Sequence, residues 1–303
     1  MTRPRLVILA RAGDRFHERH YLVQQMIPQW ESLGLGVVVT SEDEPFVSGD
    51  AALLHVDLTL TPDGLRRLAE RYPRVLNGRV LDIRKRSFSG ALVSRTGPDP
   101  GRVIVKTDWN CGGRNEFRLA ILESRPARLL RAFGLDQQLL RFREWLEEQR
   151  PWARRRWIHT SEYRVLDSRG EVPAAVWRNP NLIVERFLAE RDGERYSCRH
   201  WVFFGDRERS SRTRSIDPAV KGRTSVEPLH ESVPEALRAI RSKLGFDYGK
   251  FDYGIVDGEL ILYDVNRTPG TASNPASHAA AAAELSPGIR AFFPALGSRA
   301  AAR

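Results

Sequence analysis

The sequence is poor in cysteine and has no long hydrophobic run. Its 303 residues include two cysteines, Cys111 and Cys198, which lie too far apart for a metal-binding spacing or a disulfide framework. The apolar run from Leu6 to Ala10 is too short for a signal peptide and is followed by charged residues. No stretch approaches the length of a membrane span. These absences predict a soluble, cytoplasmic protein without a membrane partner.

The signatures of nucleic-acid-binding proteins are also missing, although the chain is basic. Its formal net charge is +10, and most of the positive charge comes from arginine. There is no lysine-rich arm, zinc-finger spacing or RNP-like motif. A basic balance suits nucleic acid, an acidic membrane surface or small anions such as nucleotides. Arginine and alanine richness is equally typical of a GC-rich genome, so we expect a small-molecule partner and no nucleic acid.

Strands and helices alternate in the first third of the chain. The hydrophobic pattern predicts strands at 5–10, 37–39, 51–58 and 74–76, and helices at 17–33 and 61–72. The second helix has Thr61 as its expected N-cap and Pro62 at its first helical position. Gly13 stands alone in its loop, so the dinucleotide-binding fingerprint is missing. The alternation predicts an α/β domain with a parallel sheet over residues 1–95.

The middle of the chain begins with a strand and a glycine pair. The strand 102–106 ends in Lys106, and Gly112 and Gly113 follow in a loop. A lysine ammonium and flexible backbone N–H groups can surround phosphates. Further on, residues 162–167 and 172–177 predict a β-hairpin, and an apolar strand over 182–188 contains a single acidic residue, Glu185.

Residues 117–160 differ in character from the rest. Leucines and aromatic residues recur there at helical spacing, with interruptions at Pro126 and Gly134. The segment then reaches Arg154, Arg155 and Arg156, which Trp152 and Trp157 flank. We expect an amphipathic helical insertion. Its arginines, with Arg150, are predicted to recognise a carboxylate-bearing substrate, and stacking on nucleic acid is the alternative.

The last third carries a pattern typical of a metal site. Asp264 and Asn266 are two apart, so their side chains leave the same face of a strand. Asp252 joins them from a neighbouring strand if Asp257-Gly258 forms the turn of a hairpin. Two carboxylates and one amide oxygen suit Mg²⁺, with Mn²⁺ as an alternative ion. A hairpin with a merely solvated polar face is the competing interpretation.

Taken in order, these features resemble the ATP-grasp superfamily. The segment Asp-Val-Asn-Arg-Thr-Pro-Gly from Asp264 is similar to Glu-Val-Asn-Thr-x-Pro-Gly of D-alanine–D-alanine ligases. The resemblance implies an α/β (α+β) ATP-grasp fold with a Rossmann-like pre-ATP-grasp domain at 1–95. A lid domain at 96–188 would carry the insertion, and a catalytic domain would span 189–303. Asp264 stands where many ligases have Glu, which leaves open whether one or two metals bind.

The resemblance also implies roles for individual residues. Lys85 would supply a second lysine for ATP, in competition with Arg84 and Arg86. The catalytic arginine would be Arg214 or Arg267. Mg²⁺ would be held by Asp252, Asp264 and Asn266. The ribose would be bound by Glu194 or Asp192. The implied ATP-binding residues are Lys85, Lys106, Gly112, Gly113, Glu185, Phe187 and Glu194.

The activity that the resemblance implies is ATP-dependent ligation. A carboxylate would attack the γ-phosphate of ATP, and an amine would displace phosphate from the resulting acyl phosphate. The substrates would be a small carboxylate and an amine, or a peptide, and a homodimer is compatible with the sequence. Two alternatives remain open: a kinase of the same fold, and a nucleotide- or nucleic-acid-binding module without ligase activity.

Overall fold

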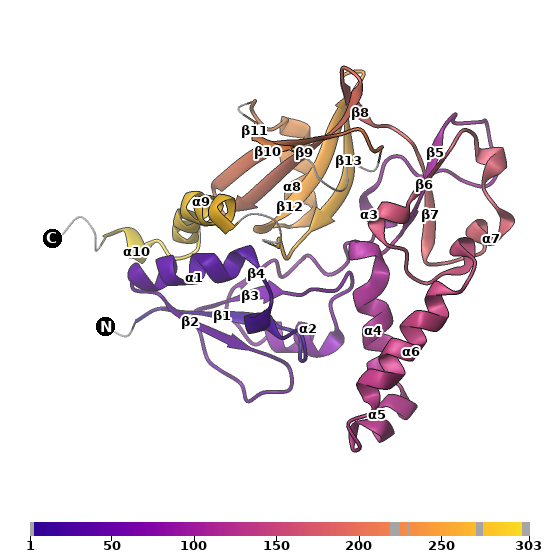
Figure 1. The fold of residues 1–303 in the computed structure, drawn as a ribbon. Coiled ribbons are helices and arrows are strands. Elements are labelled where there is room, and N and C mark those ends of the chain that lie inside the picture. Colours follow the sequence, from indigo (N-terminus) through magenta and orange to yellow (C-terminus); the bar gives the residue numbers. More distant parts are fainter. Residues whose placement is uncertain (1–2, 219–224, 230, 271–274, 299–303) are drawn as a thin grey trace.

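A computed structural model describes residues 3–218, 225–229, 231–270 and 275–298. The strands within these ranges form three sheets (Figure 1). One sheet is parallel and lies in the N-terminal part, and the other two are antiparallel. No helix of the described residues is long and apolar enough to cross a membrane.

The N-terminal sheet has the strand order β2-β1-β3-β4, and its strands are parallel. Alternate residues of β1 enter two different cores, because Leu6 and Ile8 face one side of the sheet and Val7 and Leu9 the other. The predicted parallel α/β sheet is confirmed. Its elements are β1 (Arg5–Ala10), α1 (Leu22–Ser32), β2 (Gly36–Thr40), β3 (Ala51–His55), α2 (Asp63–Ala69) and β4 (Val75–Leu76).

Two helix boundaries differ from the prediction. Residues Phe16–Glu18 form a separate 3₁₀ turn, so α1 begins at Leu22 and not near residue 17. The N-cap of α2 is Pro62 instead of Thr61. The Thr61 hydroxyl is engaged elsewhere: it donates toward Val80 O and accepts a hydrogen bond from Arg267.

The middle of the chain forms a three-stranded antiparallel sheet with the order β6-β5-β7, and an arm of three helices. Pro126 lies at the start of the second helix and Gly134 in the turn before the third, as their positions in the sequence predicted. The predicted hairpin over 162–177 is wrong, because residues after Pro173 form a short helix and β6 pairs with β5 instead. The elements are α3 (Lys85–Phe88), β5 (Val103–Thr107), α4 (Arg114–Leu122), α5 (Arg125–Arg131), α6 (Asp136–Glu148), β6 (Arg164–Leu166), α7 (Ala174–Trp177) and β7 (Leu182–Arg186).

The C-terminal sheet is antiparallel, with the path β11-β10-β9-β12-β13 and β8 paired to β9. The predicted hairpin is confirmed: Val256 pairs with Glu259, and the intervening Asp257 and Gly258 have φ of 50° and 83°. The elements are β8 (Glu190–Asp192), β9 (Arg195–Phe204), β10 (Arg207–Ser215), β11 (Ser225–Pro228), α8 (Glu235–Leu244), β12 (Tyr248–Val256), β13 (Glu259–Asn266), α9 (Pro275–Leu285) and α10 (Ala295–Ser298).

One apolar core joins the N-terminal sheet to the C-terminal one. Helix α1 packs beside α9 (Figure 1), and the Trp30 ring lies 5.1 Å from the ring of Phe204 on β9. The Trp30 indole also donates a hydrogen bond to Ser286 O at 3.0 Å. Tyr248 and Leu285 belong to the same buried cluster. The two sheets are therefore held together by continuous packing.

Candidate active site

A cavity of about 480 Å³ lies between the three-stranded sheet and the C-terminal sheet. One wall comes from β5, β7 and the residues after β7, and the other from β9, β12 and β13. Size and position between two layers are typical of a small-molecule site. The cavity brings together seven of the predicted residues: Lys85, Lys106, Glu185, Phe187, Asp252, Asp264 and Asn266.

The hairpin presents its polar residues to the cavity in two cross-strand pairs. Asp252 lies opposite Asp264, and Lys250 lies opposite Asn266. Directly opposed residues of antiparallel strands share a face, and residues two apart share it as well. The register set by the Asp257-Gly258 turn would place Asp252 opposite Tyr263, but it shifts by one residue between Asp252 and Tyr253. The four side chains therefore converge because of this β-bulge in the hairpin.

Each carboxylate of this group has an ammonium beside it. Lys85 Nζ lies 3.1 Å from Asp264 Oδ1, and Lys250 Nζ lies 2.9 Å from Asp252 Oδ1. Burial alone would lower the pKa of Lys85, but the Asp264 carboxylate outweighs it and raises that pKa. Burial would raise the pKa of Asp252, whereas the nearby Lys250 and His200 lower it well below its usual value. Both carboxylates thus face positive charge.

The donor atoms of the hairpin suit a hard cation. Asp252 and Asp264 offer carboxylate oxygens, which Mg²⁺ prefers. Asn266 also lines the cavity, but its Oδ1 already accepts a hydrogen bond from Thr268 N at 2.8 Å. The same oxygen accepts a longer hydrogen bond from Thr268 Oγ1 at 3.3 Å, which a metal on its second lone pair would replace. The predicted set of three ligands is therefore chemically consistent with Mg²⁺.

Lys106 and Glu185 face each other across the neighbouring strands β5 and β7. Lys106 Nζ forms an ion pair with Glu185 Oε2, and both side chains are nearly buried. Within the described part of the chain, the buried Glu185 Oε1 has no hydrogen-bond partner. A buried acceptor without a donor is costly, and a ligand with an N–H group would satisfy it.

The backbone at Phe187 forms hydrogen bonds within the protein. Phe187 N donates a hydrogen bond to Arg102 O at 2.8 Å, and Leu188 N donates to Arg186 O at 3.1 Å. These N–H groups are therefore engaged within the protein. Phe187 lines the cavity, but a ligand would have to use its carbonyl group or its ring.

The glycine pair supports the cavity from outside its lining. Gly112 and Gly113 have φ of 74° and 81°, a conformation that favours glycine. A Cβ on Gly112 would lie 2.3 Å from Ile158 O, so this glycine permits close backbone packing. Gly113 is the N-cap of α4. The neighbouring Cys111 lines the cavity instead of either glycine.

Besides the glycine pair, three predicted site residues lie outside the cavity lining. Arg214 is paired with Asp192 and Glu227, and Glu194 is exposed in the turn between β8 and β9. Arg267 is fully buried and donates hydrogen bonds to Val56 O at 3.2 Å and Leu58 O at 2.6 Å. These contacts do not support a catalytic role for either arginine or a ribose contact for Glu194.

The buried position of Arg267 has a simple cause. Residues next to each other on an extended chain point in opposite directions, so Asn266 faces the cavity and Arg267 faces the N-terminal sheet. Burial lowers the pKa of Arg267 to about 10, and the carbonyl groups of Val56 and Val80 accept hydrogen bonds from its guanidinium. The residue connects the end of the C-terminal hairpin to the N-terminal part of the chain.

The arginines of the insertion also lie away from the cavity lining. Arg150 pairs with Glu147 at 3.2 Å, and Arg155 pairs with Glu162 at 3.0 Å. Trp157 is buried under the guanidinium of Arg114. The predicted substrate-recognising role of this segment is not supported by these internal contacts.

Several cavity residues were missed from the sequence: Lys250, Tyr163, Cys198 and His200. Lys250 could have been found, because it is two residues before Asp252 on the same strand. Cys198 and His200 share the same spacing on β9. The Tyr163 hydroxyl lies 2.9 Å from Thr107 Oγ1. This contact joins distant segments, so no local sequence pattern predicts it.

No protein-family model and no curated protein matches the chain. Solved structures do match. One is D-alanine–D-alanine ligase from Bacillus anthracis, with 11% identity over 97% of each chain and a TM-score of 0.48. Another is an ATP-grasp RimK domain protein from Sphaerobacter thermophilus, with 12% identity, 95% and 98% coverage and a TM-score of 0.48. A third is the ATP-grasp ligase PsnB with a precursor variant, Mg and ADP, at 12% identity, 92% and 98% coverage and a TM-score of 0.47. Over nearly its full length the chain is thus similar to solved structures of ATP-grasp ligases.

Proposed function

We propose that this protein is an ATP-dependent ligase that activates a carboxylate as an acyl phosphate and couples it to an amine. The observation that carries the proposal is the convergence in one cavity of two lysines, two carboxylates and a buried acceptor without a partner. These are Lys85, Lys106, Asp252, Asp264 and Glu185. Phosphoryl transfer depends mainly on positioning and charge neutralisation, which such a set supplies.

Each group has a role in nucleotide binding. Glu185 Oε1 would accept a hydrogen bond from the adenine amino group, and the ammonium of Lys106 would contact the phosphates. Asp252, Asp264 and Asn266 would hold Mg²⁺, which when bound neutralises phosphate charge. Lys85 and Lys250 lie against the two carboxylates and would turn toward the phosphate oxygens of a bound nucleotide.

The proposed reaction needs no nucleophilic side chain of the protein, because the two substrates supply both nucleophiles. A carboxylate oxygen of the substrate forms a bond to the γ-phosphorus, and the bond to the ADP oxygen breaks. The amine then attacks the acyl carbon, phosphate leaves, and the amine loses one proton. The lysine ammonium groups would stabilise the charge that develops on the transferred group.

A trapping experiment tests the proposal. The protein is incubated with ATP, Mg²⁺ and pools of amino acids and dipeptides, and ADP, free phosphate and new masses are measured. Hydroxylamine added to the reaction should convert an acyl phosphate into a hydroxamate. A kinase would instead leave phosphate on a stable product and give no hydroxamate.

The hairpin offers a matched pair of variants for this assay. Asp264→Asn changes a cavity carboxylate, whereas Asp257→Asn changes a carboxylate in the turn, where φ of 50° is a conformation that Asn tolerates. We expect ADP formation to be lost in the first variant and kept in the second. Equal ADP formation in both variants and the parent would refute the assignment of the site.

A further inference from the structure

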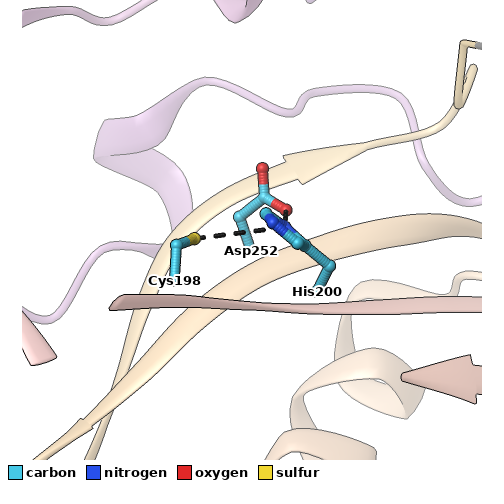
Figure 2. Close-up of side chains that lie close together, drawn as sticks. All are labelled: Cys198, His200 and Asp252. Carbon is cyan, nitrogen blue, oxygen red and sulfur yellow. Dashed lines mark hydrogen bonds and ion pairs between the residues drawn. The ribbon is translucent and has the colours of Figure 1, made fainter. Parts of the chain in front are cut away.

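A second group of metal-ligating atoms lies in the same cavity. It consists of Cys198, His200 and Asp252 (Figure 2). We propose that these three side chains bind a thiophilic divalent cation of the Zn²⁺ type, at a place distinct from the oxygen ligands Asp264 and Asn266. The proposal concerns the chemistry of these three residues and holds whether or not the protein is a ligase.

The strand register places the three ligands together. Cys198 and His200 are two apart on β9, so they share a face, and Asp252 on β12 lies directly opposite His200. The cysteine sulfur lies 4.0 Å from His200 Nδ1, and Nδ1 lies 2.6 Å from Asp252 Oδ1. One ligand atom from each of the three residues falls within 4.8 Å of the others.

These distances are close to those of a metal site. Zinc bonds of about 2.3 Å to sulfur and about 2.0 Å to nitrogen or oxygen, at tetrahedral angles, separate S from N by roughly 3.5 Å and N from O by roughly 3.3 Å. The observed sulfur–nitrogen separation is therefore nearly suitable. The nitrogen and oxygen would move apart by less than about 1 Å, as the ion takes the place of the hydrogen bond between them.

A neighbouring hydroxyl orients the histidine. His200 Nε2 lies 2.7 Å from Thr213 Oγ1, and Thr213 is the direct partner of Cys198 on β10. This contact fixes the imidazole ring so that Nδ1 faces Asp252 and the cysteine sulfur (Figure 2). With a metal on Nδ1, the Nε2–H group would donate to the hydroxyl. Metal-bound histidines commonly have such an outer partner.

The donor set selects the kind of ion. One sulfur, one nitrogen and one oxygen suit Zn²⁺ or Co²⁺, whereas Mg²⁺ prefers oxygen ligands alone. Binding would release the thiol proton, and Nδ1 of His200 would carry no proton while the metal is bound. The thiolate and the carboxylate then offset the charge of the ion, although Lys250 beside Asp252 competes for that oxygen.

The arrangement leaves one tetrahedral position open, because only three protein ligands are present among the described residues. All three residues line the cavity, so water or a donor atom of a bound ligand would complete the coordination. Asp252 is shared between this group and the proposed Mg²⁺ ligands. Occupation of the two sites is therefore expected to be coupled through this one carboxylate.

Cobalt provides a direct probe, because a thiolate bound to Co²⁺ absorbs strongly in the near ultraviolet. The full chain, freed of metals with a chelator, is titrated with Co²⁺ in the absence of nucleotide, and Zn²⁺ is then added. We expect one equivalent of Co²⁺ to produce the sulfur band and Zn²⁺ to remove it. Cys198→Ser should abolish the band, and the matched variant Cys111→Ser should keep it.

Further variants separate ligation from a general loss of structure. Thr213→Val removes only the orienting hydroxyl and should weaken Co²⁺ binding by about tenfold, the lower end of the effect of outer partners. Absence of the sulfur band in the folded parent, or its persistence in Cys198→Ser, would overturn the proposal. Affinity of Thr213→Val equal to that of the parent would overturn the orienting role.

The same variants distinguish this site from the proposed ligase function. Asp264→Asn should keep the cobalt band and lose Mg²⁺-dependent binding of ADP, measured by calorimetry. Cys198→Ser should show the reverse behaviour. If the parent protein binds MgADP but shows no cobalt–sulfur band, only the thiophilic site is refuted. If it shows the band but does not bind MgADP, only the nucleotide-binding assignment is refuted.

Discussion

Replacing Asp264 with asparagine tests how the proposed metal ligands are coupled to the buried lysine beside them. Lys85 Nζ lies 3.1 Å from Asp264 Oδ1, and the exposed fractions of the two side chains are 4% and 31%. Asparagine has the same shape as aspartate but carries no charge. The variant therefore leaves a buried ammonium that still donates a hydrogen bond to Trp109 O at 3.1 Å but has lost the charge of its partner. We expect a loss of stability as well as a loss of metal binding.

The size of the effect follows from the geometry. Two unit charges 3.1 Å apart attract each other by about 5 kcal/mol at an effective dielectric constant of about 20. Breaking a buried ion pair by removing one partner costs about 3–5 kcal/mol. Because water reaches part of Asp264, we expect the free energy of unfolding to fall by about 2–3 kcal/mol.

Urea unfolding without nucleotide or Mg²⁺ measures this loss, and a double-mutant cycle identifies its cause. Lys85→Met keeps the length of the side chain and removes its charge. If the unpaired ammonium destabilises Asp264→Asn, the double variant should recover most of the lost free energy. Asp257→Asn on the same hairpin serves as the control. An unchanged urea midpoint for Asp264→Asn, or a double variant no more stable than it, would refute the reasoning.

Three further variants test other parts of the structure. Lys106→Met should weaken MgADP binding by about tenfold or more, because a phosphate-binding charge is lost, and an unchanged Kd would contradict this. Glu185→Gln should narrow the preference for ATP over GTP by about tenfold, or about 1.4 kcal/mol, measured by competition binding. Burial and the neighbouring Asp57 raise the pKa of the Asp14 carboxyl group to about 7. The stability that the protonated carboxyl group contributes is therefore fully present below about pH 4 and is lost as the pH rises through about 7. Asp14→Asn should therefore flatten the pH dependence of thermal unfolding in this range and be more stable than the parent at about pH 8; a variant that keeps the parental pH profile would disprove the assignment.

The elements that the sequence predicted well are those with strong local signals. The parallel sheet has continuous apolar strands, and the Asp257-Gly258 turn pairs β12 with β13. The register shift that brings Asp252 opposite Asp264 was not predicted. Lys85 was preferred to Arg84 and Arg86 because the resemblance implies a second lysine, and it is the residue among the three that lines the cavity. Arg84 pairs with Asp82, and Arg86 pairs with Asp108.

The predictions that failed depend on contacts between residues that are far apart in the sequence. Arg214 was a plausible catalytic cation until its partners on β8 and β11, Asp192 and Glu227, were known. Arg267 was assigned by its place in a motif, although the alternation of side chains along a strand turns it away from Asn266. The group of Cys198, His200 and Asp252 depends on the pairing of β9 with β12, which are separated by more than 40 residues.

The core that joins α1 to α9 has a consequence for how the chain folds as it is synthesised. Trp30, Phe204 and Leu285 belong to one buried cluster, although the first is made long before the last. Domains made early in synthesis commonly fold before the rest of a chain appears, but here the part of α1 that packs against α9 stays uncovered until α9 emerges. Contacts of such large sequence separation also slow folding. The N-terminal sheet is therefore expected to reach full protection from hydrogen exchange only after the C-terminal helices have been made.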